Sequence, residues 1–544
     1  MKLAILYKLK SYMQNCKIAY IVDFKDYLGG AGNHLLRHAI LSKSFGIEEI
    51  VVIPQCGENK FNNDIENFCV KNKLNYCFID YKIATDFCHL DGDKIENSMN
   101  EFIKFIEDNN IGLIHSVQLN PAVEMAARIL GIPHVMSIYQ IEKNCFDVGY
   151  PDMFPSFIHS DSFLYEKIWH DGLKADTICI RSYIPERFKE NSNVERKYIK
   201  NKNEFSCIVS GSLCDRKSQH KIIEVAGILK KEGIKLNVKI LGYVDTKSIY
   251  FNLCKSIEEK YQLKNQVIYI GFCKNVELEM KNADFLICAS NDESFPQVIL
   301  EAMAMRIPVI STPVAGVPEL IKNNETGYLS SDFEVESIKG AVKRYVDDYI
   351  YNRQHIERVI NNAYDIYEKE CSKESVAQKL FGFYYSAAKN KKVYSDKQKD
   401  LKFLLRKYND FSMDDFINYM TLSLDESSLA LIKNNKFGIV YKINCIKNLY
   451  SNKIVNCYIW GASTAGKATM YTLEYKMKNF NICGFIDKFK NGEFNKIKIY
   501  KPEEIDYSTQ VFIFIATGPG KKEAVEFLET KGLKVNQNYI SIFV

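Results

Sequence analysis

The chain has 544 residues, and its 72 Lys and Arg side chains outnumber its 67 Asp and Glu side chains only slightly, for a net charge of +5. This length exceeds what one hydrophobic core supports, so we expect three domains. The small net charge argues against a nucleic-acid partner, and the sixteen cysteines show no Cys-x-x-Cys spacing. We therefore expect reduced thiols in a cytoplasmic protein.

Membrane attachment has only weak support in the sequence. No apolar run approaches the roughly 18 residues that a membrane-spanning helix requires. The N-terminal segment MKLAILYKLKSYMQN places three lysines around a few apolar side chains. This pattern favours a packed or frayed helix, with a weak membrane-surface helix as the alternative. Peripheral association with the inner face of the cytoplasmic membrane stays compatible with it.

Residues 1–195 alternate apolar strands with helical patterns. Strands are predicted at 17–23, 48–55, 112–116 and 134–139, with helical patterns between them. This βαβ rhythm predicts a doubly wound parallel sheet.

A strand-to-helix loop of this first domain contains Gly29, Gly30 and Gly32, followed soon by His34. Glycines at such a place let the backbone pass close to a substrate, whereas the plain alternative is a tight turn. His34 stands at the start of the next helix, where a structural role and a functional one are equally compatible with the pattern.

The βαβ rhythm restarts after a polar stretch and continues over residues 196–385. The strand FSCIVS leads into the loop GSLCDRKSQ, which opens a helix. This loop offers Gly211 for close backbone approach, and Arg216 and Lys217 for the oxygens of a phosphate. The alternative is a pair of solvated loop cations. Two successive doubly wound domains predict a ligand cleft between them.

The segment from Glu293 to Glu301 is the most informative of the second domain. The run ADFLICAS before it reads as a strand buried on both faces, and PQVILEAMAM reads as a helix. Ser294 and Gln297 fit a capping box, with Pro296 in the first turn. Glu293 is thus expected beside free helix N–H groups, with Glu301 about two turns into the helix. Two carboxylates beside an anion site suit a sugar joined to a diphosphate.

Residues 386–452 are Lys-rich and helical in pattern, which predicts a connector, and residues 453–544 form a third α/β segment. In that segment a strand leads into a glycine loop between Gly461 and Gly466, and a second strand ends in Asp487. This order is typical of a Rossmann-type nucleotide fold.

Two positions of this glycine loop depart from known nucleotide motifs. Ala468 follows Lys467 where a P-loop needs Ser or Thr, and Ser463 stands where a dinucleotide loop has its middle glycine. A nucleotide or nucleotide-sugar site and a structural or docking module both stay open.

The spacing of Glu293 and Glu301, followed by PVISTPVAGVPELI and NNETGYL, resembles the donor-binding region of retaining GT-B glycosyltransferases of the family 4 type, glycosyl transferases group 1. The resemblance covers residues 17–385 and implies the GT-B fold, two Rossmann-like domains facing a cleft. It also implies that Glu293 contacts the donor sugar and that Glu301 holds the ribose hydroxyls. The third segment resembles small Rossmann-like domains attached to polysaccharide-biosynthesis proteins.

The chain departs from this family at three positions. The loop beginning at Gly211 is similar to the family pattern Gly-Arg-Leu-x-x-x-Lys, with Lys217 at the lysine and Ser212 in place of the arginine. Arg216 supplies the missing guanidinium only if the loop turns it inward. Tyr139 stands where the family commonly has a histidine, and tyrosine is a poor base at neutral pH. Arg306 stands where the family usually has glycine.

We therefore expect a retaining glycosyltransferase that moves a sugar from a nucleotide-diphosphate sugar to a glycan, lipid-linked or protein acceptor, in cell-surface polysaccharide or glycoconjugate assembly. The rival hypothesis is a non-catalytic GT-B-like binding subunit of a glycosylation complex, and other glycan-assembly proteins are compatible partners of either. No Asp-x-Asp motif or histidine cluster demands a metal, so no metal or cofactor is expected. The expected catalytic residues are Glu293, Lys217 and Tyr139, and the expected donor-binding residues are Gly29, Gly30, Gly211, Ser212, Arg216, Lys217, Glu293, Ser294, Phe295, Pro296, Gln297 and Glu301.

Overall fold

The computed structural model describes residues 2–22, 30–55, 63–81, 92–117, 120–139, 156–173, 175–192, 203–291, 293–393 and 454–541, apart from 464–465, 467–468, 471–472, 474–478, 518–519 and 536–537. The described residues up to 393 belong to one compact unit, and those from 454 onward belong to a second. Most of the predicted connector, 394–452, lies outside the described residues, as do Gly29, Lys467 and Ala468.

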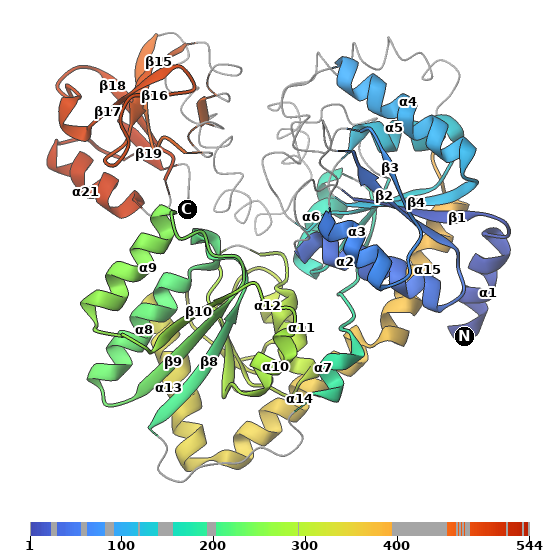
Figure 1. Ribbon diagram of the computed structural model, residues 1–544, viewed down its shortest axis with the longest axis horizontal. Helices are drawn as coiled ribbons and strands as arrows, with labels where there is room; N and C mark the ends of the chain where they lie inside the picture. The colour runs from blue at the N-terminus through green and yellow to red at the C-terminus, as the bar shows by residue number, and fades with distance from the viewer. Residues whose placement is uncertain are drawn as a thin grey trace. The chain divides into compact units, whose positions relative to one another are not determined.

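The first sheet contains seven parallel strands in the order β3-β2-β1-β4-β5-β6-β7. The order reverses between β1 and β4, which is the switch point of a doubly wound sheet, and helices cover both of its faces (Figure 1). The strands are β1 Lys17–Ile21, β2 Glu49–Pro54, β3 Tyr76–Ile79, β4 Ile111–Val117, β5 His134–Ser137, β6 Phe157–Ser160 and β7 Asp176–Cys179. The helices are α1 Lys2–Tyr12, α2 Gly30–Ser44, α3 Asn63–Lys71, α4 Gly92–Asp108, α5 Pro121–Leu130, α6 Phe163–Leu173 and α7 Glu186–Glu190.

The second sheet repeats this plan with six parallel strands in the order β10-β9-β8-β11-β12-β13. Its switch point lies between β8 and β11. The strands are β8 Glu204–Ser210, β9 Lys235–Leu241, β10 Val267–Gly271, β11 Phe285–Cys288, β12 Val309–Ser311 and β13 Tyr328–Leu329. The helices are α8 Gln219–Lys231, α9 Ile249–Lys260, α10 Val276–Lys281, α11 Gln297–Ala304, α12 Val317–Leu320, α13 Val335–Tyr351 and α14 Arg353–Cys371, preceded by the short 3-10 helix Asp215–Lys217.

Helix α15, Lys373–Lys389, returns from the second sheet to the first. It packs against α1 and contacts α2 and β5, and Figure 1 shows it beside α1. Its side chains Val376, Leu380 and Tyr384 are buried in the same core as Leu9 and Tyr20. The segment that ends the predicted second domain therefore completes the core of the first, because one face of α15 is apolar throughout.

The second compact unit holds a third sheet in the order β16-β17-β15-β14-β18-β19, parallel except for β16 against β17. Apolar clusters pack on its two faces, so it too is a layered α/β arrangement. Its strands are β14 Val455–Trp460, β15 Phe480–Ile486, β16 Glu493–Phe494, β17 Ile497–Tyr500, β18 Val511–Ile515 and β19 Tyr539–Ser541, and helix α21 spans Lys521–Thr530.

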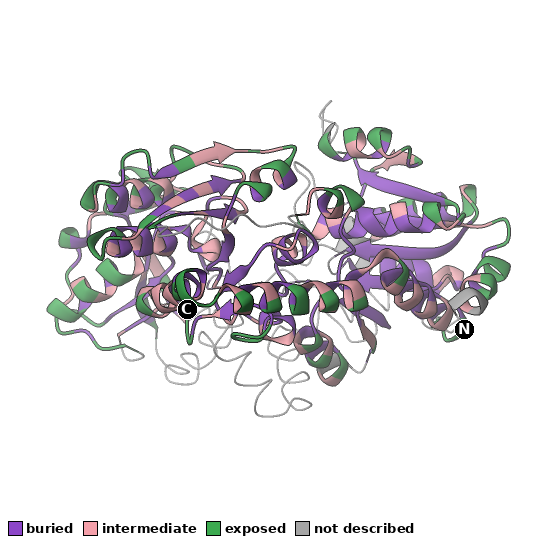
Figure 2. Ribbon diagram, turned by 90° about the horizontal axis from the view of Figure 1, so that it is seen from below, coloured by how far each residue is buried: buried purple, intermediate pink, exposed green. Residues whose placement is uncertain are grey.

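Burial follows the pattern that the sequence predicts. Strands β4 and β11 are buried at every residue, and Figure 2 shows buried strands beneath helices with exposed outer faces. Continuous apolar strands are typical of parallel sheets covered on both faces. The expected α/β fold, with two doubly wound sheets and a smaller third one, is confirmed. Among the described residues, no helix combines the length and the apolar character needed to cross a bilayer.

Candidate functional site

Two loops meet at the carboxyl edge of the second sheet, at its switch point. Strands β8 and β11 are neighbours, so the loop after β8 lies beside the loop after β11. The backbone N–H of Asn291 donates to the carbonyl of Arg216 at 2.9 Å and ties the two loops together. Open α/β sheets bind ligands at this position because the strand order leaves a crevice there.

Gly211 directly follows β8 and has a backbone conformation that other residues rarely adopt. Its φ is 141°, and a Cβ built on it would lie 3.2 Å from Cε of Lys217. Glycine therefore lets the Lys217 side chain lie directly over the backbone of the loop. The adjacent Ser212 contributes its carbonyl, which accepts a hydrogen bond from Gln219 Nε2 at 3.0 Å and holds the start of α8.

The carboxylate of Glu293 lies between two cations from the loop after β8. Arg216 Nη1 is 3.1 Å from Oε2, and Lys217 Nζ contacts Oε1. Ser290 Oγ also donates to Oε1 at 3.4 Å. The Glu293 side chain is only 11% exposed. The loop thus turns Arg216 inward. This orientation is what Arg216 needs in order to replace the arginine that the family has at Ser212. That Arg216 binds phosphate stays a prediction.

The charges of this cluster are mutually stabilising. Burial alone would raise the pKa of Glu293, but the attraction of Lys217 and then of Arg216 outweighs burial and lowers the pKa. The carboxylate is therefore ionised at neutral pH. An anionic ligand at this edge has to compete with Glu293 for the two cations.

The start of α11 differs from the sequence prediction. The helix begins at Gln297, with Pro296 as its N-cap residue and no side-chain cap, so the predicted capping box of Ser294 and Gln297 is wrong. Glu301 is consequently the fifth residue of the helix, about one turn from its start rather than two. The helix start without a side-chain cap leaves backbone N–H groups for an anion.

Ser294 bonds instead to the first domain. Its hydroxyl donates to the carboxylate of Asp161 and lies 3.2 Å from Ser162 Oγ. Gly316 packs against the same place, since a Cβ there would lie 2.4 Å from Cβ of Ser162. Burial raises the pKa of Asp161 to about 7, against the opposing effects of Ser294 and Arg181. Asp161 therefore changes its charge near neutral pH.

Glu319, in the loop region that resembles the family, also reaches the first domain. Its two carboxylate oxygens accept from the backbone N–H groups of Phe163 and Leu164, each at 3.0 Å, at the start of α6. The same carboxylate pairs with Arg181, whose guanidinium lies over the rings of Phe163 and Phe295. Glu319 thus supplies the helix start with an acceptor from another domain.

Two further contacts join α11 to α2. Arg37 Nη2 lies 3.2 Å from Glu301 Oε1, and Gln297 Nε2 donates to the carbonyl of Gly30 at 2.8 Å. Burial raises the pKa of Glu301, while Arg37 opposes that shift. Sequence reasoning missed Arg37, Asp161 and Arg181, because nothing in their local pattern indicates a partner more than a hundred residues away.

Tyr139 lies apart from the Glu293 cluster in its polar contacts. Its ring is buried and stacks on the ring of His34, with centroids 4.7 Å apart. Its hydroxyl lies 3.4 Å from His159 Nδ1. Burial raises the pKa of Tyr139 above its ordinary value, so this hydroxyl is protonated at neutral pH. Its predicted catalytic role stays a prediction.

In the third sheet, Ala462 and Ser463 of the loop after β14 bond to residues that follow the two neighbouring strands. The carboxylate of Asp487 accepts backbone hydrogen bonds from Ala462 at 3.1 Å, Phe489 at 2.9 Å and Lys490 at 3.0 Å. Ser463 Oγ donates to the carbonyl of Ala516 at 3.3 Å. These polar groups are engaged with the protein's own backbone, and nucleotide binding here stays a prediction.

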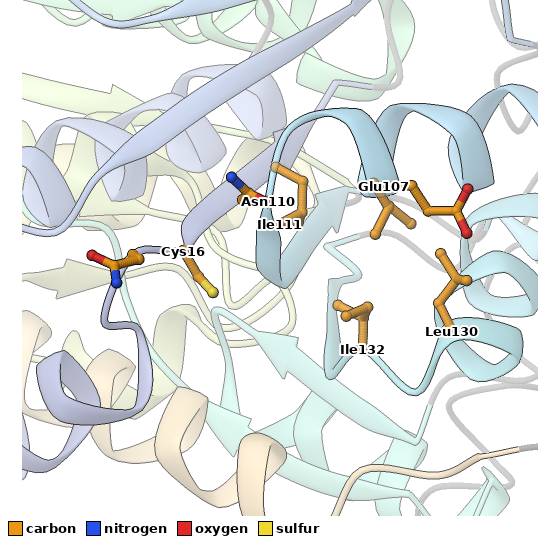
Figure 3. Close-up of a pocket in the computed structure, with 8 residues that line it drawn as sticks. Cys16, Glu107, Asn110, Ile111, Leu130 and Ile132 are labelled. Atoms are coloured by element: carbon orange, nitrogen blue, oxygen red, sulfur yellow. The ribbon is translucent and has the colours of Figure 1, made fainter.

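A separate hollow of about 510 Å³ lies on the first domain (Figure 3). It is found where β1 and β4 begin, at the edge of the sheet opposite to the carboxyl ends of the strands. Its lining mixes apolar and uncharged polar groups with one carboxylate, and we assign it no role in the site above. The lining residues are Asn15, Cys16, Ile106, Glu107, Asn110, Ile111, Leu130 and Ile132.

Comparisons with known proteins give this geometry a context. Residues 190–365 match the family Glycosyl transferases group 1. N-acetyl-alpha-D-glucosaminyl L-malate synthase from Bacillus anthracis is 28% identical over 138 residues, which are 24% of this chain and 36% of that protein. The capsular polysaccharide biosynthesis glycosyltransferase CapM from Staphylococcus aureus is 25% identical over 169 residues, 30% of this chain and 43% of CapM. The chain therefore spans less than half the length of these curated relatives.

The solved structure of HepE from Anabaena in complex with UDP aligns over a longer part of the chain. Its TM-score is 0.52 at 15% identity, and the alignment covers 67% of this chain and 98% of HepE. At this identity the likeness shows the fold, which is the GT-B fold of glycosyltransferases. Residues 190–365 are thus similar to a glycosyl transferases group 1 domain, and they lie within a GT-B fold.

Proposed function

We propose that the protein is a retaining glycosyltransferase, which moves a hexose-type sugar from a nucleotide-diphosphate sugar to a hydroxyl of a glycan, lipid-linked or protein acceptor. The observation that carries the proposal is the Glu293 carboxylate between Arg216 and Lys217, at the switch-point edge of a glycosyl transferases group 1 domain. UDP in the HepE structure supports a nucleotide-sugar donor, and the name of CapM supports a role in cell-surface polysaccharide assembly.

At the proposed donor site, the cations change their ion-pair partner when the donor binds. The diphosphate of the donor takes Lys217 and Arg216 from Glu293, and the N–H groups at the start of α11 add further donors. Glu293 is then released to accept hydrogen bonds from sugar hydroxyls. Glu301 is proposed to accept hydrogen bonds from the ribose hydroxyls, and its ion pair with Arg37 breaks when the donor binds.

The proposed reaction breaks the bond between the anomeric carbon and the diphosphate oxygen, and the diphosphate leaves with the electron pair. The oxygen of the acceptor hydroxyl bonds to the same carbon on the face that the diphosphate leaves, and its proton passes to the departing diphosphate oxygen, so the anomeric configuration is retained. Lys217 and Arg216 offset the charge that develops on the leaving group. We propose that these cations and helix amides act without a metal at the diphosphate.

The acceptor is proposed to enter from the first domain. Gly30 lies against Gln297 of the donor side, and Tyr139 belongs to the same domain as Gly30. The contacts of Glu319 with Arg181 and with the start of α6 join the two domains beside the proposed site. Such contacts exclude water, which matters because hydrolysis of the donor competes with transfer. We propose a cytoplasmic location, with acceptors presented at the inner face of the membrane.

The test is calorimetric binding and transfer with a panel of UDP-, GDP- and ADP-sugars. The wild type is compared with Glu293→Ala and Lys217→Ala, and with the control variants Glu279→Ala and Lys239→Ala, which break an ion pair of 2.9 Å elsewhere in the same domain. We expect binding of one nucleotide class, transfer by the wild type and the controls, and loss of transfer in both site variants. A wild type that binds no nucleotide sugar would refute the enzyme function and leave the binding-subunit hypothesis.

A further inference from the structure

Three histidines from two elements of the first domain converge beneath the Tyr139 ring. His34 and His38 lie four residues apart on α2 and so project from one face of that helix, and His159 lies on β6. Their ring centroids are 4.7 Å, 5.2 Å and 5.1 Å apart in the three pairings. One ring nitrogen of each lies within 4.8 Å of the corresponding nitrogens of the other two.

Of the six ring nitrogens of the three histidines, four have no hydrogen-bond partner in the described part of the chain. They are Nδ1 and Nε2 of His34 and of His38, and both side chains are completely buried. A buried polar atom without a partner is rare in folded proteins and calls for a specific explanation. Ring stacking alone does not satisfy the lone pair and the N–H group that each neutral imidazole carries.

The third histidine has its tautomer fixed by the backbone. His159 Nε2 lies 2.7 Å from the carbonyl of Ile180, which can only accept, so Nε2 carries the proton. Nδ1 is then a lone pair, 2.8 Å from Ser137 Oγ. Ser137 Oγ also lies 2.6 Å from His115 Nε2, so its hydroxyl can donate there instead. An imidazole whose other nitrogen donates to a backbone carbonyl is the usual state of a metal-ligating histidine.

From these observations we propose that His34, His38 and His159 bind one divalent transition-metal ion, with zinc as the expected ion, through one ring nitrogen each. Zinc–nitrogen bonds of about 2.0–2.1 Å place tetrahedral ligand nitrogens about 3.3 Å apart, so the rings have to close inward modestly. The ion gives a partner to one of the two orphaned nitrogens of His34 and to one of the two of His38. None of the three ligands belongs to the proposed donor site, and the proposed metal takes no part at the diphosphate.

The metal would fasten the start of α2 to the sheet. His34 is the fifth residue of a helix whose first residue, Gly30, accepts the hydrogen bond from Gln297 of the second domain. A tie between α2 and β6 thus fixes the first-domain side of the proposed transfer site. The role of the ion is to position α2 relative to β6. Binding of the ion does not depend on the proposed reaction.

The experiment measures metal in the full-length chain purified without a metal-affinity tag. Elemental analysis is expected to find one zinc per chain, or one equivalent taken up by the chelator-treated protein, with cobalt giving the absorption of a tetrahedral site. His34→Gln and His38→Leu are each expected to weaken zinc binding at least tenfold. The control His220→Gln, a histidine of the second domain bonded to Tyr250, is expected to keep full binding.

X-ray absorption of the wild-type zinc or cobalt form makes the proposal independent of variant folding. We expect three imidazole nitrogens at about 2.0 Å from the ion. A wild type that takes up no zinc or cobalt at micromolar concentration would overturn the proposal. Absorption data without imidazole ligands, or His38→Leu with unchanged affinity, would overturn it equally. Calorimetry with nucleotide sugars measures the proposed function in a separate experiment. Failure of the metal site can therefore be distinguished from failure of the proposed function.

Discussion

Two carboxylates, Glu293 and Asp487, each follow a strand beside the first strand of their sheet, and their surroundings differ. Glu293 follows β11, across the switch point from β8, whereas Asp487 follows β15, on the other side of β14 from its switch point. Glu293 faces the side-chain cations Arg216 and Lys217 from the adjacent loop. Asp487 faces three backbone N–H groups of its own unit. Cations on side chains can move to an incoming phosphate, whereas the three backbone donors at Asp487 are already bonded to its carboxylate.

The comparison teaches that strand order locates a crevice but does not supply its chemistry. Both sheets reverse their order at a glycine-containing loop, after β8 and after β14. Only the second sheet, within the described residues, combines that loop with a buried carboxylate held by exchangeable cations. We therefore propose ligand chemistry at the Glu293 edge and a structural role for Asp487.

The largest effect is expected for Lys217→Ala. The loss of a cation that stabilises the leaving diphosphate should lower kcat/KM for transfer about 10²–10³-fold, equivalent to about 2.7–4 kcal/mol. Release of the nucleoside diphosphate measures it, with Lys239→Ala as the control. A kcat/KM of Lys217→Ala within twofold of the wild-type value would show that Lys217 does not stabilise the leaving diphosphate.

Glu319→Ala should be the most destabilising substitution at the domain contact. It leaves Arg181, 1% exposed, without its carboxylate and removes the acceptor of two N–H groups at the start of α6. We expect a loss of about 3 kcal/mol in the free energy of unfolding, measured by urea denaturation. The exposed Glu325→Ala serves as the control, and equal stability of the two variants would contradict the role of Glu319.

Asp161 predicts a pH dependence of the stability of the first compact unit. Its pKa is about 7 when folded and about 4 when unfolded, so the folded state binds more protons between these values. Stability should fall as the pH rises from 5 to 7, by on the order of 2 kcal/mol. Denaturation of wild type and Asp161→Asn at several pH values measures it. The variant should show a flatter slope, and the exposed Asp365→Asn should keep the wild-type slope.

The smallest of these effects is expected for Asp487→Ala. Loss of an acceptor for three backbone N–H groups should destabilise the second unit by about 1–2 kcal/mol and speed its proteolysis. Binding of nucleotide sugar should stay at the wild-type level. If Asp487→Ala folds normally but no longer binds the nucleotide sugar, the ligand binds at the third sheet and not at the Glu293 edge.

Local patterns predicted the sheets and the placement of Glu293, because continuous apolar strands and glycine loops are local properties of the chain. The capping box failed because α11 begins only at Gln297, with Pro296 as its N-cap residue, and Ser294 before it donates to Asp161 of another domain. The partners Arg37 and Arg181 could not be predicted for the same reason, as nothing near them in sequence indicates Glu301 or Glu319. The spacing of His34 and His38 was a readable signal for a shared helix face, but His159 joins them only through the fold.

The central claim is that Glu293 and a nucleoside diphosphate compete for Lys217 and Arg216, and Glu293→Gln tests it most directly. Calorimetry should show about tenfold tighter binding of the nucleoside diphosphate to the variant, because the cations no longer have a competing carboxylate. Transfer should meanwhile fall about 100-fold, since Glu293 no longer orients the sugar. Glu279→Gln should change neither quantity. Nucleoside diphosphate affinity that is unchanged or weaker in Glu293→Gln would contradict the claim.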